Sequence, residues 1–256
     1  MADPGLHSPL LDFFRRGEVA RDVRELAARG ALAPGPHEQL ALLIVLTDDA
    51  DPGIAAQAVS TLDAIPQSIL EAFLARPEVP PRMRDYFAAR GVHPGAVASD
   101  DGESPLVPID ESDQPPETGE SDEPRALSSL GVTDRVKLAM KGTREQRSQL
   151  IRDPNRMVSA AVLSSPKLTD AEVEQFAKMA NVSEETLRII ATNRNWIKSY
   201  TIIAALTRNP KTPPALSLRF IPRLVDKDIK GLVTDRNVPE ALRIAARKII
   251  SKGRER

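Results

Sequence analysis

The segment SAAVLSSPKLT at 159–169 returns 44 residues later as IAALTRNPKTP at 203–213. Both copies carry an alanine pair that is followed, five residues on, by Pro-Lys. A second pair, LRIIATNRN at 187–195 and IKGLVTDRN at 229–237, repeats after 42 residues and shares an Arg-Asn ending. A period of about 40–47 residues with helical patterning is typical of stacked-helix solenoids. The repeat therefore predicts an all-α solenoid.

The composition is that of a globular chain with an aliphatic core. Of the 256 residues, 41% are hydrophobic and only 4% are aromatic, which favours Ala, Leu, Ile and Val at close helix contacts. The sequence has no cysteine, which excludes disulfides, thiolate metal sites and a cysteine nucleophile. We expect no membrane span and, because no signal sequence is recognisable at the N-terminus, a cytoplasmic location.

Charge divides the chain into three segments. Residues 1–98 carry 9 basic and 13 acidic residues, a net charge of −4, whereas 99–124 carry ten acids and no base. Residues 125–256 carry 26 basic and 13 acidic residues, a net charge of +13. We predict an N-terminal helical repeat lobe at 1–98 and a basic C-terminal helical repeat lobe at 125–256.

Between the predicted lobes lies SDDGESPLVPIDESDQPPETGESDEP at 99–124. Five prolines, ten acids and no helical period leave too little apolar surface to offset chain entropy. This segment is predicted to be a disordered acidic linker.

Helix-start signals recur through the C-terminal lobe. A Ser or Thr with Glu or Gln three residues later forms a capping box, and proline fits the first helical position. The predicted helix starts are at Thr133, Thr143, Thr169, Ser183 and Thr212. From these signals and the apolar spacing we predict helices at 155–164, 170–180, 184–193, 196–207, 213–222, 226–234 and 239–251.

The N-terminal lobe follows a similar order. We predict a helical hairpin at 6–14 and 18–29, followed by one repeat unit built from segments 40–52, 54–66 and 69–90.

The Ala- and Leu-rich helices broken by Asp-Pro at 153–154 and Asn-Pro at 209–210 resemble HEAT and armadillo-type repeats, including bacterial leucine-rich-repeat-variant solenoids. The resemblance covers about 37–95 and 130–252. It implies two short right-handed solenoid lobes that act as a protein-binding platform. A minority of such repeats bind DNA or carry base-excision chemistry.

The sequence offers no catalytic constellation. No phosphate loop, Ser/His/Asp order or paired-carboxylate motif is recognisable, so we expect a non-enzymatic protein without a cofactor or small-molecule substrate. The histidines His7, His37 and His93 stand far apart, each near a Pro or Gly turn. We interpret them as surface loop residues and expect no metal site.

Three Asn/Asp-rich turns, at 153–155, 193–195 and 235–237, have two readings. One hypothesis is that they provide a ladder of polar contacts to a ligand. The other, which we favour, is that their side chains bond the local backbone at helix ends and turns. Trp196 and Tyr200 stand four residues apart, which would place them on one helix face, either packing between units or anchoring a partner. The residues that differ between copies are expected to be mostly exposed. The candidate binding residues are Arg194, Trp196, Lys198, Tyr200, Arg208 and Arg236.

Two functions follow from the basic lobe. The first is a protein-interaction scaffold whose partner presents an acidic surface to residues 125–256. The alternative is nucleic-acid binding without base readout, which would weaken steeply with salt because bound counterions are released.

Overall fold

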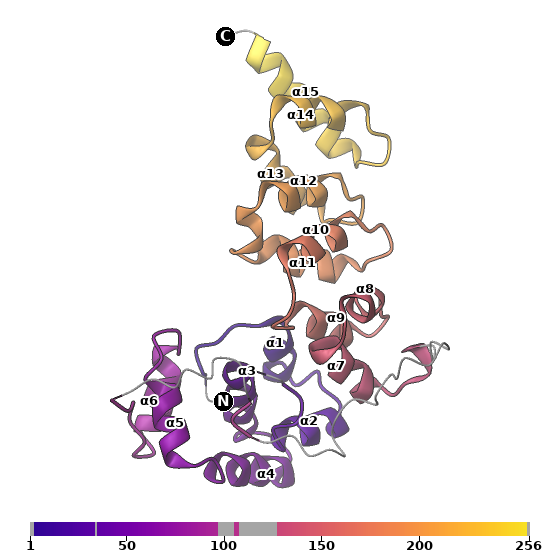
Figure 1. The fold of residues 1–256 in the computed structure, drawn as a ribbon. Helices are drawn as coiled ribbons and strands as arrows, with labels where there is room; N and C mark the ends of the chain where they lie inside the picture. Colours follow the sequence, from indigo (N-terminus) through magenta and orange to yellow (C-terminus); the bar gives the residue numbers. More distant parts are fainter. Residues whose placement is uncertain (1–2, 34, 97–104, 108–126, 255–256) are drawn as a thin grey trace. The chain divides into compact units, whose positions relative to one another are not determined.

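The computed structural model describes residues 3–33, 35–96, 105–107 and 127–254. Every regular element in these ranges is a helix, and they contain no β-strand (Figure 1). The predicted all-α class is confirmed. None of the described helices combines the length and the apolar character that crossing a membrane requires.

The chain forms two compact units. Unit 1 comprises Met1–Gln146 and Ala160–Lys167, and unit 2 comprises Arg147–Ser159 and Leu168–Arg256. The helices of unit 1 are α1 (Pro9–Arg15), α2 (Arg21–Ala28), α3 (Pro36–Leu46), α4 (Pro52–Asp63), α5 (Gln67–Leu74), α6 (Pro81–Ala88), the 3₁₀-helix η2 (Leu127–Ser129) and α7 (Val132–Lys141). Those of unit 2 are α10 (Asp170–Lys178), α11 (Glu184–Thr192), η3 (Trp196–Lys198), α12 (Tyr200–Arg208), α13 (Pro214–Phe220), η4 (Ile221–Arg223), α14 (Asp226–Thr234) and α15 (Glu240–Arg254). Helices α8 (Arg144–Leu150) and α9 (Arg156–Leu163) contain residues of both units.

These units do not coincide with the predicted lobes 1–98 and 125–256, because α7 packs on an N-terminal helix. Helix α7 contacts α2, and the Thr133 hydroxyl donates a hydrogen bond to the Asp22 carboxylate at 2.8 Å. The predicted linker 99–124 lies outside the described residues except for Pro105–Val107, which contact α3 and are treated below.

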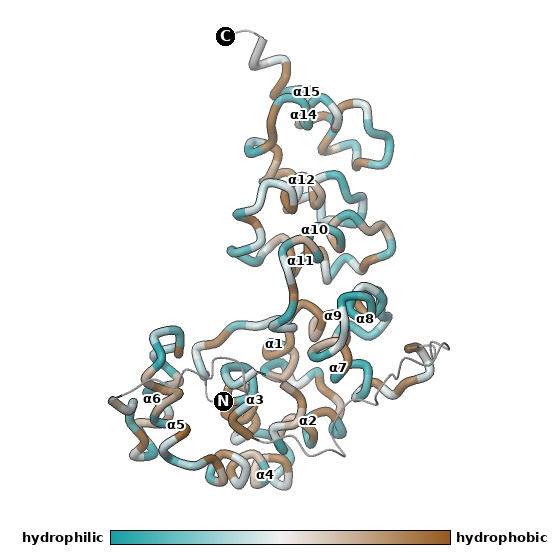
Figure 2. The backbone as a smooth tube through the Cα atoms, viewed as in Figure 1, coloured by the Kyte–Doolittle hydropathy of each residue, from teal (hydrophilic) through white to brown (hydrophobic). Residues whose placement is uncertain are grey.

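Helix α3 forms the centre of unit 1. All residues from Gln39 to Leu46 are buried, and α1, α2 and α4 all pack against this helix. From Leu40 to Leu46 this helix is apolar on all sides. Such a helix must be covered on all sides, which explains this arrangement (Figure 2).

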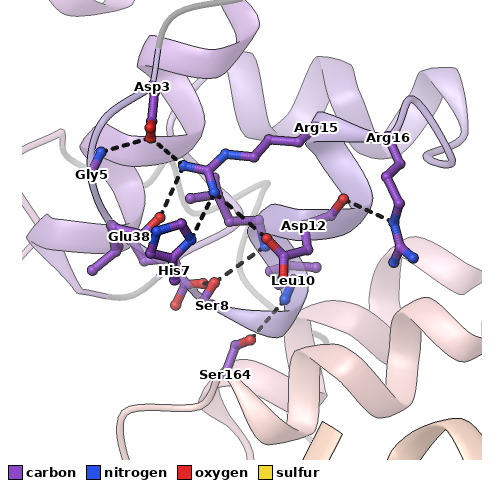
Figure 3. A network of polar contacts seen from close by, with 12 residues as sticks. Asp3, Gly5, His7, Ser8, Leu10, Asp12, Arg15, Arg16, Glu38 and Ser164 are labelled. Atoms are coloured by element: carbon purple, nitrogen blue, oxygen red, sulfur yellow. Dashed lines mark hydrogen bonds and ion pairs between the residues drawn. The ribbon is translucent and has the colours of Figure 1, made fainter. Parts of the chain in front are cut away.

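A polar network ties the start of α3 to the start of α1 (Figure 3). The Ser8 hydroxyl caps α1 by accepting the Leu11 N–H at 3.2 Å, and it donates to the carboxylate of Glu38 in the first turn of α3. The hydroxyl of Ser164 accepts the N–H of Leu10 at 3.0 Å. Desolvation of the Glu38 carboxyl raises its pKa to about 7, although the hydrogen bond from Ser8 opposes the shift.

The predicted helix starts are partly correct. Thr169 and Ser183 cap α10 and α11, and Thr143 exchanges two hydrogen bonds with Gln146. Thr133 was wrongly assigned, because α7 begins one residue earlier at Val132 and Thr133 points to Asp22 instead. Likewise α13 begins at Pro214 rather than beside Thr212.

One predicted segment of the N-terminal lobe contains two helices, and one predicted helix of the C-terminal lobe is split in two. Segment 69–90 contains α5 and α6 separated by a turn, and segment 196–207 contains η3 and α12. In the second case Ser199 is extended, with φ −72° and ψ 123°, and this residue separates the two elements.

Ser165 and Asn209 occupy matching positions in the repeat, and both donate hydrogen bonds to carbonyls at the end of an earlier helix. The Ser165 hydroxyl donates to the carbonyl of Met140 at the end of α7 (2.8 Å). The Asn209 amide donates to the carbonyls of Ala177 and Met179 at the end of α10 (2.8 and 3.0 Å). Both residues are buried, so the expectation that differing repeat residues are mostly exposed is wrong here. Each side chain satisfies helix-end carbonyls that lack an intrahelical partner.

Within unit 2, a buried ion pair joins α8 to α10. The Arg147 guanidinium donates to the Glu172 carboxylate at 2.8 and 3.0 Å, and the two side chains are 5% and 2% exposed. The other oxygen of Glu172 accepts from the N–H and the hydroxyl of Thr169, which completes a capping box. At the same helix positions, α11 and α13 carry Leu187 and Leu216.

We expect Arg147→Leu to lower the free energy of unfolding by about 3–5 kcal/mol, because it leaves the buried carboxylate of Glu172 without its ion-pair partner. The double variant Arg147→Leu/Glu172→Leu, which copies the leucine pair of α11 and α13, should be more stable than the single variant. Urea unfolding measures both. Arg188→Leu, which breaks an exposed ion pair with Glu184, is the control and should change stability by about 1 kcal/mol at most. A single variant as stable as this control would contradict the prediction.

Glu38 should make unit 1 less stable as pH rises. Its folded pKa of about 7 lies above the ordinary value of 4.5, so the folded state holds a proton that the unfolded state releases between these values. Above pH 7 the charged carboxylate then costs up to about 3 kcal/mol. Glu38→Gln should recover this stability at about pH 8 and change little at about pH 4, as measured by urea unfolding. Glu18→Gln, at an exposed site of the same unit, is the control; equal gains in both variants would count against burial as the cause.

Candidate functional site

An open groove of about 680 Å³ lies within unit 2. Its lining comes from α10 and α12, each with the turn that follows it, and from the turn between α14 and α15. The lining residues are Glu174, Lys178, Ala180, Tyr200, Thr201, Ala204, Ala205, Arg208, Asn209, Pro210, Asp235 and Asn237.

Helix α12 supplies the central part of the lining. Tyr200, Ala204 and Arg208 recur every four residues and therefore share one helix face. The small side chain of Ala204 leaves room between the two long ones.

Asp228 on α14 holds both long side chains of α12. It accepts a hydrogen bond from the Tyr200 hydroxyl and one from the Arg208 guanidinium, the latter at 2.6 Å. The Tyr200 hydroxyl also accepts the N–H of Val225 at 3.2 Å. The Tyr200 oxygen is thus occupied by the protein, while the residue remains 38% exposed. The hydrogen bond to anionic Asp228 raises the pKa of Tyr200 above its ordinary value.

The α10 side of the groove is also paired internally. Lys178 donates to Glu174 at 2.5 Å, and this hydrogen bond, with a second from Thr201, lowers the pKa of Glu174. The lining therefore contains two cations, Lys178 and Arg208, each already bound to a carboxylate.

The structure brings only some predicted binding residues to this groove. Tyr200 and Arg208 line it, and exposed Arg236 stands between two lining residues, Asp235 and Asn237. Arg194, Trp196 and Lys198 are not among the lining residues.

The prediction that Trp196 and Tyr200 lie on one helix face is wrong. Extended Ser199 separates η3 from α12, so the spacing of four residues does not fall within one helix. Trp196 is half-buried, whereas Tyr200 is exposed.

The three Asn/Asp-rich turns use their first side chain to bond the local backbone. The N–H groups of Asn155, Asn195 and Asn237 donate to the side chains of Asp153, Asn193 and Asp235, at 2.8, 2.9 and 2.9 Å. This confirms the structural reading. Arg194 and Arg236 at the centres of two turns are exposed, and neither forms an ion pair within the described residues.

Several groove residues were not singled out from the sequence. Glu174 and Lys178 could have been found, because charges four residues apart on a predicted helix form a pair. Asp228 could not, because its contact with Tyr200 spans 28 residues and depends on how α14 packs.

The histidines partly match the surface-loop interpretation. His7 and His93 are exposed residues outside helices. His37 is an exception: it lies in α3, its ring packs edge-on to Phe73 at 4.8 Å between centroids, and burial lowers its pKa. Within the described part of the chain, no group of three or more His, Asp or Glu residues could hold a metal ion.

Comparison of the chain with models of known protein families, with curated proteins and with solved structures gives no match.

Asp228→Asn should lower the pKa of Tyr200 toward its ordinary value of about 10, because it removes the anion beside the hydroxyl. Ultraviolet absorbance of tyrosinate reports this titration, in a Tyr86→Phe background where Tyr200 is the remaining tyrosine. Asp226→Asn, an exposed position on the same helix, should leave the titration unchanged. An unshifted pKa in Asp228→Asn would show that the contact does not persist in solution.

Proposed function

We propose that unit 2 forms a short right-handed solenoid of the HEAT and armadillo-like kind and binds a polypeptide segment of a partner in the groove on α12. Its role is that of a non-enzymatic adaptor. The observation that carries the proposal is the groove itself, with an exposed tyrosine held in place by Asp228.

The groove chemistry favours a polypeptide over a polyanion. Its cations Lys178 and Arg208 already bind Glu174 and Asp228, and Asp235 adds a further negative charge. A phosphate chain would have to displace these carboxylates. A peptide instead offers apolar side chains for the Tyr200 ring and polar backbone groups for Asn237.

Arg236 supports an acidic residue in that partner. It is exposed next to the groove lining, and its guanidinium has no ion-pair partner among the described residues. An acidic side chain near the bound segment would therefore gain a contact without disrupting an existing pair.

Nucleic-acid binding is the second candidate and rests on charge alone. Residues 125–256 carry 26 basic and 13 acidic residues, and Arg194 and Arg236 are exposed at matching turns. Such a surface would bind outside the groove through phosphate contacts.

The absence of cysteine allows a specific test. A photo-crosslinker is attached to a single cysteine in the full-length protein. In one variant the cysteine replaces Thr201, which lines the groove. In the control variant it replaces Thr143, an exposed residue of unit 1. We expect Thr201 to capture a defined polypeptide and Thr143 not to. The addition of Ala204→Lys should abolish capture, whereas Ala241→Lys, at an exposed position outside the lining, should not.

The same samples separate the two functions. A captured species that is sensitive to nuclease and is lost with added salt would favour nucleic acid. Capture at Thr201 that persists after Ala204→Lys would exclude the groove as the binding site.

A further inference from the structure

A short stretch of the acidic segment is bound to unit 1 through its backbone. The Oε1 atom of Gln39 accepts the N–H groups of Leu106 and Val107 at 2.8 and 3.0 Å. The Nε2 atom of Gln39 donates to the carbonyl of Val107 at 3.2 Å and to that of Gly30 at 2.7 Å. A single side-chain amide thus pairs with the docked residues much as a neighbouring β-strand would.

This arrangement has the features of a built binding site. Gln39 is 1% exposed and begins the buried stretch of α3 that ends at Leu46, so its amide is held in position by packing. Without the segment, the Oε1 atom of Gln39 would lose its hydrogen bonds to Leu106 and Val107, whereas Nε2 would keep its bond to Gly30. An unpaired buried polar atom is costly. The position of Gln39 is therefore suited to hold an extended peptide backbone.

Gly30 lets the segment come close. A Cβ atom at this position would lie 3.0 Å from the Cβ and one Cγ of Val107. Gly30 also has φ +77°, because it follows the C-cap of α2 in a left-handed turn. The glycine therefore serves both the helix end and the approach of Val107.

The docked segment itself has the character of a ligand. In the sequence, prolines 105 and 108 flank the Leu-Val pair. A residue before proline favours extended backbone, and proline fixes its own φ, so such a segment loses little entropy on binding. Backbone hydrogen bonds supply affinity, while the side chains at 106 and 107 supply selectivity, as in other modes of extended-peptide recognition.

We propose that unit 1 carries a peptide-binding site centred on Gln39 and Gly30, and that Pro105–Val107 is its tethered ligand. The segment occupies the site in the same molecule, and an external extended peptide with the pattern Pro-Leu-Val-Pro competes for it. Only residues 97–104 separate Pro105–Val107 from the preceding described stretch of unit 1. A connection this short gives the linked segment an effective concentration at the site in the millimolar range. The site is independent of the groove in unit 2.

The direct test opens the site and adds the ligand back. The probe is a fluorescent peptide with the sequence ESPLVPID, residues 103–110. Full-length Leu106→Asp/Val107→Asp should bind it at least about tenfold more tightly than the unaltered protein, because the tethered competitor is lost. Adding Gln39→Leu should abolish this binding, whereas Gln57→Leu, at an exposed glutamine of the same unit, should not.

A glycine pair provides a test that leaves Gln39 and the segment intact. Gly17 and Gly30 both follow a helix C-cap with φ +70° and +77°, but a Cβ at Gly17 would meet nothing within 4 Å. Alanine at either position brings the same backbone strain. Hydrogen exchange at the amides of Leu106 and Val107 should accelerate in Gly30→Ala and remain slow in Gly17→Ala.

Three results would overturn the proposal. The first is no binding of the peptide to the Leu106→Asp/Val107→Asp protein at millimolar concentration. The second is equal amide exchange at 106 and 107 in the two glycine variants. The third is a dimer of the unaltered protein that the peptide dissociates, since the segment would then occupy a second copy of the chain.

Discussion

The way helices end determines the construction of unit 2. Helices α10, α11, α12 and α14 all stop at an extended residue, with ψ between 115° and 123°. Three of these residues are Asn193, Asn209 and Asp235, whose side-chain oxygen accepts the N–H two residues later. In unit 1, by contrast, glycines with positive φ follow α1, α2 and α6. An Asx end turns the chain sharply without a left-handed residue, so helices can follow one another at short intervals.

These same helix ends shape the candidate groove. Asn209 lines it while its amide holds the carbonyls of Ala177 and Met179, and Asp235 lines it while it bonds Asn237. The polar atoms committed to these bonds are unavailable to a ligand. The exposed ring of Tyr200 and the space above the small side chain of Ala204 are not engaged in these bonds.

The sequence predicted those features that depend on residues close together in the chain, above all the positions of helices. Capping residues and apolar spacing located the helices of unit 2 to within one or two residues at α10, α11 and α14, because these signals act within one turn. They failed at Ser199, where no proline or glycine marks the extended residue that separates η3 from α12. They also failed for the burial of Asn209, which depends on contact with α10, more than 30 positions earlier in the chain. Thus Tyr200 and Arg208 were predicted as site residues, while their shared partner Asp228 was not.

Asn209 and Gln39 each bond backbone groups through a buried side-chain amide, but the two contacts differ in what must be broken to release them. Asn209 bonds carbonyls at the end of α10, which cannot leave without unfolding that helix. Gln39 bonds residues 67 and 68 positions away that belong to no helix. Releasing them costs the hydrogen bonds at Gln39 and the burial of two half-exposed side chains, but no secondary structure. Since an incoming backbone can replace every one of these bonds, exchange at Gln39 requires only local opening, whereas loss of the Asn209 contacts accompanies unfolding of unit 2.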